Sequence, residues 1–265
     1  MKLCSISSGS SGNCIFAGSE HTALLIDAGL SGKKMEQGLQ SLGYKAEDLN
    51  GILVTHEHSD HIKGLGVMAR RYGVPIYTTR GTWEAVKKDG KAGKIPEELF
   101  HEIRPDVHTL IGDMTIEPFR ISHDAAEPVG YRMSHEGSSA AVATDMGTYD
   151  AYTLEHLQKL DAILLEANHD IRMLQCGRYP YYLKMRILGD HGHLSNEASG
   201  QLLSSILHDD LKHIFLGHLS AENNYPALAY ETVCSEVTLS DTPYKSDDFP
   251  IVVARRDAVG EMIEF

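Results

Sequence analysis

The chain alternates between short apolar runs of strand length and longer stretches in which apolar residues recur at helical spacing. Residues 23–26 (Ala-Leu-Leu-Ile), 51–55 (Gly-Ile-Leu-Val-Thr) and 75–78 (Pro-Ile-Tyr-Thr) are expected to form buried strands. Residues 62–72 are expected to form a helix, because their apolar side chains fall on one face at a period of about 3.6 residues. This alternation predicts an α/β protein.

Four later apolar runs each end at a histidine or an acidic residue. They cover residues 114–121, 139–144, 161–165 and 213–217, and they lead into His123, Asp145, Glu166 and His218. Strand ends are where α/β proteins assemble sites from distant parts of the chain, so we expect these side chains to meet. The chain has no low-complexity tract, clear repeat or long proline-rich linker, and residues 1–265 are therefore expected to form a single domain.

The composition is that of an ordinary globular protein, with 42% hydrophobic residues and a formal net charge of −13. A protein that held nucleic acid by a global positive field would be basic, so a polyanion would have to meet local basic clusters or metal ions. The N-terminus lacks a signal-peptide run and no apolar run could span a bilayer, which predicts a cytoplasmic protein without a membrane partner. The four cysteines form no Cys-x-x-Cys pair and are expected to be free thiols.

The strongest chemical signal is the run of residues 56–61, His-Glu-His-Ser-Asp-His. His56 and His58 lie two residues apart at the end of a strand, so extended geometry sends both imidazoles to the same side. Asp60 and His61 follow in the turn before the helix and can face a second position nearby. Imidazoles combined with a carboxylate suit Zn²⁺, Mn²⁺ or Fe²⁺ better than Ca²⁺ or Mg²⁺.

Four residues cannot fill two coordination spheres, so further ligands have to come from other strand ends. His123, Asp145 and His218 are placed where such ligands would be supplied. A hydroxide held between two metal ions is nucleophilic at neutral pH, because coordination lowers the pKa of water towards about 7. The pattern therefore predicts a hydrolase with two metal ions.

In their order and separations, these motifs resemble those of the metallo-β-lactamase superfamily, and Asp27-Ala28-Gly29 also matches it. The resemblance implies an αββα four-layer sandwich with the metal site at one edge of its two sheets. It also implies a ligand set for two divalent transition-metal ions, Zn²⁺ or Mn²⁺ and otherwise Fe²⁺. His56, His58 and His123 would hold the first ion, Asp60, His61 and His218 the second, and Asp145 would lie between them.

The C-terminal third narrows the expected substrate. Ser195 is a good N-cap for a helix that reaches Leu207, and a helix N-terminus with His193 beside it suits a phosphate oxygen. Residues 190–197 resemble the phosphate-contacting motif of the nuclease branch that includes ribonuclease J and the β-CASP enzymes. Those enzymes insert a domain ahead of this motif, whereas only about twenty residues separate it from Glu166 here.

Without that domain, residues 178–186 are expected to contact the substrate. They combine basic residues, including Arg178 and Lys184, with three tyrosines. This composition can pair with phosphates and stack on bases, although it is equally that of a packing loop. Ser8 and Ser10, in a Ser/Gly run at the N-terminus, are expected to contact a terminal 5′-phosphate.

Almost the whole chain resembles the YycJ (WalJ) group of bacterial metallo-β-lactamase-fold proteins. The similar segments include the opening Ser/Gly run, Asn-His-Asp at 168–170, Arg-Tyr-Pro at 178–180 and Gly-His-Leu-Ser at 192–195. The resemblance implies a phosphodiesterase that degrades DNA from its 5′ end, with Asp60 and His193 as catalytic residues and with DNA favoured over RNA. His193 would protonate the leaving 3′-oxygen. The open alternatives are an RNA-processing nuclease, a thioester or cyclic-nucleotide hydrolase of the same fold, and a non-catalytic binding or redox protein.

Overall fold

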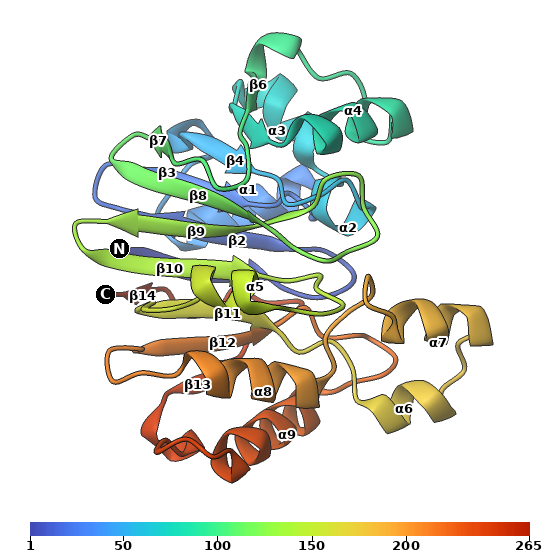
Figure 1. Cartoon of the computed structure of the whole chain (residues 1–265). Coiled ribbons are helices and arrows are strands. Elements are labelled where there is room, and N and C mark those ends of the chain that lie inside the picture. Colours follow the sequence, from blue (N-terminus) through green and yellow to red (C-terminus); the bar gives the residue numbers. More distant parts are fainter.

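The computed structural model describes residues 1–265 and contains two β-sheets of seven strands each (Figure 1). The first sheet has the order β14-β1-β2-β3-β4-β5-β6, which is Ile263–Glu264, Lys2–Ser7, Cys14–Gly18, Ala23–Ile26, Gly51–Leu53, Ile76–Thr78 and Phe100–Glu102. The second has the order β13-β12-β11-β10-β9-β8-β7, which is Ile251–Val253, His213–Gly217, Ala162–Glu166, Ser138–Ala143, Val129–His135, Met114–Arg120 and Thr109–Ile111.

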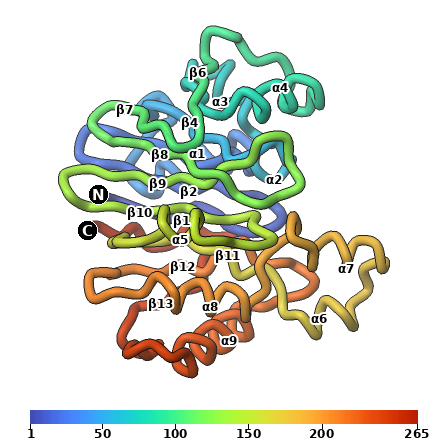
Figure 2. Tube along the Cα trace, in the orientation of Figure 1, coloured from blue at the N-terminus to red at the C-terminus, as the bar shows by residue number.

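Helices cover the outer face of each sheet, and others lie at the edges. They are α1 Gly32–Ser41, α2 Ser59–Ile62, α3 Leu65–Tyr72, α4 Arg80–Asp89, α5 Ala151–His156, α6 Ile171–Cys176, α7 Tyr181–Leu188, α8 Asn196–Ile206 and α9 Pro226–Leu239. Buried side chains of α1, α3 and α4 form one core with the first sheet, and those of α8 and α9 form another with the second sheet. The expected αββα four-layer sandwich is confirmed, and the tube in Figure 2 follows the chain through its layers.

The third core lies between the two sheets and follows from the alternation of side chains along each strand. In β3, Leu24 and Ile26 belong to this central core, whereas Leu25 belongs to the core beneath the helices. Successive residues of a strand point to opposite faces, so a strand covered on both sides is apolar throughout. This is why continuous apolar runs in the sequence correctly predicted β3, β4 and β5.

The helix expected over residues 62–72 is divided into α2 and α3. The interruption falls at Gly64, whose amide donates to the Ala28 carbonyl at 2.8 Å. A Cβ atom on Gly64 would lie 2.3 Å from the Leu30 carbonyl oxygen, so only glycine permits this approach. The break holds α2 against the loop that follows β3.

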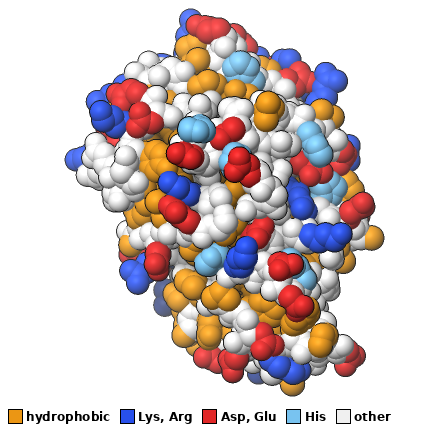
Figure 3. All heavy atoms as spheres, turned by 90° about the vertical axis from the view of Figure 1, so that its left-hand side faces the viewer, with side chains coloured by type: hydrophobic (Ala, Val, Ile, Leu, Met, Phe, Trp, Pro, Cys, Tyr) orange, Lys and Arg blue, Asp and Glu red, His pale blue; other side chains and the backbone are white.

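The two ends of the chain meet in the first sheet. β14 pairs antiparallel with β1, and the N-terminal amine of Met1 lies 2.5 Å from the Phe265 carbonyl oxygen. On the face that carries both ends, acidic and basic side chains are interspersed rather than gathered by sign (Figure 3). None of the helices has both the length and the apolar character needed to cross a membrane.

Replacing Gly29 by alanine is expected to destabilise the fold beside α2. An added Cβ atom would lie 1.7 Å from the Asp60 carbonyl oxygen and 2.5 Å from the Asn13 amide nitrogen, and both are backbone atoms that cannot yield locally. Overpacking of this kind costs about 1–3 kcal/mol, measured as a fall in the free energy of unfolding. Gly260→Ala is the control, because the nearest atom to its Cβ would be 3.3 Å away. Equal stability of the two variants would contradict this reading.

Candidate metal centre

A polar cavity of about 490 Å³ lies at the edge where the strands of both sheets end. Helices α2 and α7 border it through Asp60 and Arg186. In Figure 1, α6 and α7 project on the same side of the molecule as α2. The residues that line the cavity include no hydrophobic side chain; they are Ser10, Glu57, His58, Ser59, Asp60, Asp89, Lys91, Asp145, Arg186, His193 and His218.

Three strand ends reach this edge through an unusual backbone conformation. Asp27, Asp145 and His218 follow β3, β10 and β12, and their φ angles are 63°, 60° and 54°. The left-handed region is costly for residues other than glycine, by roughly 1–3 kcal/mol in a strained setting, and such residues gather at functional sites. Here the three residues that adopt this backbone conformation all direct their side chains towards the same edge of the two sheets.

The first group of candidate ligands consists of three imidazoles. His56, His58 and His123 each offer a nitrogen atom, and these atoms lie within 4.8 Å of one another. Nε2 of His123 is 3.3 Å from Nδ1 of His58, while its Nδ1 is 3.1 Å from the Gly192 carbonyl oxygen. His56 is completely buried, yet its Nε2 has no hydrogen-bond partner. A buried nitrogen without a partner is costly in a protein and fits a metal ligand.

The second group combines a carboxylate with two imidazoles. Nε2 of His61 lies 3.6 Å from Oδ2 of Asp60, and Nε2 of His218 lies 3.5 Å from the same oxygen. Asp145 stands between the two groups, because it is 3.3 Å from Nε2 of His61 and 3.7 Å from Nε2 of His123. Its Oδ2 is buried and has no hydrogen-bond partner.

The seven side chains expected as metal ligands therefore meet in one cluster. They come from the loop after β4, from α2 and from the ends of β8, β10 and β12. Five imidazoles and two carboxylates form a donor set that suits Zn²⁺, Mn²⁺ or Fe²⁺. The residues present thus fit the binding of divalent metal.

Two buried carboxylates support the cluster from behind. Oδ2 of Asp27 is 2.7 Å from Nδ1 of His61, and Oε1 of Glu166 is 2.9 Å from Nδ1 of His218. A carboxylate that accepts the Nδ1 proton leaves Nε2 free to bind a metal and fixes the direction of the ring. The sequence marked Asp27 and Glu166 as parts of motifs, but these supporting contacts were not predicted.

The electrostatics differ between the two groups. Burial lowers the pKa of His56 and of His123, so both rings remain neutral, as metal binding requires. Burial also disfavours the charged form of His218, but the carboxylates of Asp145, Asp60 and others outweigh it and raise its pKa to about 10. Burial opposes ionisation of Asp60 too, yet the neighbouring imidazoles hold its pKa well below the usual range. The carboxylates around the second group thus favour a positive charge at His218, and a bound metal ion would take the place of that proton.

His193 lies at the wall of the cavity and shares a supporting carboxylate with the cluster. Its Nδ1 is 2.8 Å from Oε1 of Glu166, and its side chain is 21% exposed. Ser195 begins α8 as predicted, since its hydroxyl accepts the Ala198 amide at 3.1 Å. Ser195 is 8% exposed and does not line the cavity, so the structure does not bring its hydroxyl beside His193 at the metal centre.

The two serines expected at a phosphate-binding lip lie in different environments. Ser10 is exposed and lines the cavity. Ser8 is 1% exposed, and its hydroxyl accepts the His218 amide at 2.8 Å. Ser8 therefore holds the backbone of a candidate ligand instead of facing solvent, because its side chain points into the turn after β12.

In the basic segment 178–186, the residue that reaches the metal centre is not one of the two that were expected to contact the substrate. Arg186 lines the cavity and pairs with Asp124, the neighbour of His123. Lys184 instead donates to the Gln175 carbonyl at 2.7 Å, and Arg178 is exposed but lies outside the cavity lining. Sequence reasoning took the segment as a whole, and helical geometry in α7 decides which side chain faces the metal centre.

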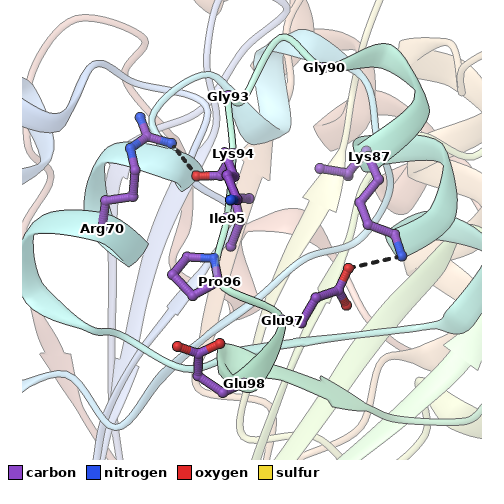
Figure 4. Close-up of a pocket in the computed structure, with 10 residues that line it drawn as sticks. Arg70, Lys87, Gly90, Gly93, Lys94, Ile95, Pro96, Glu97 and Glu98 are labelled. Carbon is purple, nitrogen blue, oxygen red and sulfur yellow. Dashed lines mark hydrogen bonds and ion pairs between the residues drawn. The ribbon is translucent and has the colours of Figure 1, made fainter.

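A larger cavity, of about 770 Å³, lies beside the loop after α4 and contains none of the candidate ligands (Figure 4). Two of its basic side chains already have partners. Arg70 donates to the Lys94 carbonyl at 2.8 Å, and the Lys87 ammonium is 3.2 Å from Glu97. Size alone therefore does not make this cavity the functional site.

Comparisons with known proteins agree with the fold and the cluster. A family model described as a beta-lactamase superfamily domain matches residues 22–211. The chain is 42% identical to the exodeoxyribonuclease WalJ of Streptococcus pneumoniae over 89% of its length and 88% of the relative's. It is 43% identical to the exodeoxyribonuclease YycJ of Bacillus anthracis over 86% of both chains. The metallo-beta-lactamase fold protein YhfI of Bacillus subtilis superposes with a TM-score of 0.66 and 18% identity, covering 98% of each chain.

Asp27→Asn is expected to weaken metal binding by about 10- to 100-fold, the usual effect of losing a carboxylate behind a ligating histidine. Asparagine tolerates the left-handed backbone of this position, so the variant removes charge with little strain. Competition with a chromogenic chelator measures the affinity. Asp113→Asn is the control, because Asp113 binds Ser19 and Thr22 away from the cluster. Unchanged affinity in Asp27→Asn would refute the supporting role.

Proposed function

We propose that this chain, which belongs to the metallo-β-lactamase superfamily, is a metal-dependent exodeoxyribonuclease. The observation that carries the proposal is its identity of 42–43% with two exodeoxyribonucleases, WalJ and YycJ, over nearly the full length of each. The cavity supports it, because a polar opening at a His/Asp cluster suits a phosphodiester better than an apolar substrate.

Two divalent ions, Zn²⁺ or Mn²⁺ and otherwise Fe²⁺, are the proposed cofactors. The separation of the candidate ligands into two groups supports this number, with His56, His58 and His123 in one and Asp60, His61 and His218 in the other. Asp145, which is within 3.7 Å of a histidine of each group, would contact both ions. When bound, the ions would activate a water molecule and neutralise charge on the phosphoryl group.

The chain's own residues would orient the substrate and move the proton. Asp60 lines the cavity and would contact the attacking water as well as metal. The water oxygen, after losing a proton to solvent, adds to phosphorus while the bond from phosphorus to the 3′-oxygen breaks. His193 would donate a proton from Nε2 to that leaving oxygen, since Glu166 occupies its Nδ1. Arg186, at the wall of the same cavity, would pair with a phosphate oxygen.

DNA is the proposed partner and its 5′ end the proposed start of degradation. The protein is acidic overall, so phosphates would be met locally by metal and by Arg186 and Lys91, which line the cavity. Ser10, which also lines the cavity, would contact a phosphate there, and Arg178 and Lys184 would contact the strand further out. We also propose that residues 1–265 act as one domain, because the terminal strands β1 and β14 pair within one sheet.

Digestion of end-labelled DNA tests the function. Metal-loaded protein is expected to shorten linear single- or double-stranded DNA from the 5′ end and to leave circular DNA intact. Matched RNA strands and strands without a 5′-phosphate report the preference for sugar and for the terminal group. Cleavage of circular DNA, or inactivity on every DNA with metal bound, would overturn the proposal.

Asp145→Ala is expected to abolish hydrolysis and to lower the metal content measured by mass spectrometry, because the only carboxylate between the two ligand groups is lost. Asp89→Ala provides the control, since Asp89 lines the cavity but belongs to neither ligand group. Full activity of Asp145→Ala with wild-type metal content would exclude the assignment.

His193→Ala is expected to retain metal while turnover falls about 10²- to 10⁴-fold, the range typical of a lost general acid. His191→Ala, two residues away and exposed, should keep wild-type turnover. Loss of metal from His193→Ala would show that His193 is instead a ligand, which its position near Asp145 and His218 also permits.

A further inference from the structure

A second, smaller cavity of about 160 Å³ adjoins the metal-centre cavity. The two share Ser10, Arg186 and His193, so these side chains stand at the boundary between them. The metal-centre cavity has no hydrophobic side chain in its wall, whereas the smaller cavity has some. A ligand that lies across the boundary would therefore meet a polar metal centre on one side and an amphipathic pocket on the other.

The pocket has one wall from α7 and another from the body of the protein. Tyr179 precedes α7, and Leu183 and Ile187 lie four residues apart on one face of it. Asn168 and Ser220 belong to the opposite wall. That wall is held in place, since Asn168 donates to the His218 carbonyl at 2.9 Å.

Helix α7 is placed by polar contacts rather than by an apolar core. None of its residues is buried, and Tyr181 and Tyr182 are 77% and 75% exposed. Arg186 fastens it to Asp124 beside the metal centre, and the Lys184 ammonium binds the end of α6. A helix that buries none of its side chains and presents one face to a cavity is arranged for contact with a ligand.

We propose that this pocket holds the terminal nucleotide of the DNA strand, an inference that rests on the proposed function. The base would lie against Tyr179 and the Leu183–Ile187 face, where stacking and apolar contact are independent of sequence. The volume equals that of about five water molecules, which accommodates one base and no second nucleotide. A second nucleotide would therefore have to lie outside this pocket.

The position of His193 fixes which nucleotide this is. The leaving 3′-oxygen belongs to the nucleotide that is released, and the donor for that oxygen stands at the boundary of the pocket. The released nucleotide then carries the new 3′-hydroxyl, and the shortened strand keeps the phosphate as its new 5′ end. The pocket thus accounts for release of one nucleotide per cycle from the 5′ end.

Filling the pocket tests the inference with two substrates. Leu183→Trp is expected to lower the hydrolysis of linear 5′-phosphorylated DNA at least tenfold, while hydrolysis of bis(p-nitrophenyl) phosphate stays within twofold of wild type. The small ester is expected to reach the metal centre through the polar cavity, without occupying the pocket. Met185→Trp is the control on the same helix, because Met185 is 50% exposed and lies outside the pocket lining. It should leave both activities unchanged.

Tyr179→Ala gives an independent reading that does not depend on a tryptophan fitting the site. Loss of one stacking contact is expected to raise the KM for DNA by about 5- to 100-fold with little change in the small ester. Wild-type DNA hydrolysis by Leu183→Trp, or an equal loss of both activities, would overturn the pocket. Inactivity of metal-loaded wild-type protein on DNA would instead overturn the proposed function itself.

Discussion

The metal centre depends on hydrogen bonds made behind the imidazole rings. The Nδ1 atoms of His61, His218 and His123 are occupied by Asp27, Glu166 and a backbone carbonyl. Each ring therefore turns its Nε2 towards the cluster, where Oδ2 of Asp145 has no hydrogen-bond partner. Because Asp27 and Glu166 are buried at strand ends, this arrangement is as rigid as the two sheets that carry it.

Much of the fold and most of the cluster could be predicted from sequence, because local patterns carried the information. Strands buried on both faces are continuous apolar runs, and His56, His58, Asp60 and His61 are close in space because they are close in the chain. The contacts of Asp27 with His61 and of Glu166 with His218 join residues 34 and 52 positions apart. No local pattern encodes such pairs, so these roles emerged only from the structure.

Residues outside the cluster were harder to predict for a different reason. Helix α7 contains no buried residue, so sequence reasoning did not identify it as a helix of the core. Without its helical geometry, Arg178, Lys184 and Arg186 were equivalent, although only Arg186 lines the centre. Likewise Ser8 and Ser10 look alike in sequence, and one is buried while the other is exposed. The type of each side chain predicted the contacts that it can make, whereas the direction in which it points determines whether it reaches the metal centre.

The joining of the two chain ends has a consequence for synthesis of the protein. The loop that carries Ser8 is held by the carbonyls of Arg255 and Arg256, near the end of the chain, and Ser8 in turn holds His218. The nascent chain therefore cannot complete this part of the centre until almost all of it has left the ribosome. A hydrolytic centre that matures last is kept from assembling on a partly made protein, in the midst of the nucleic acid that surrounds translation.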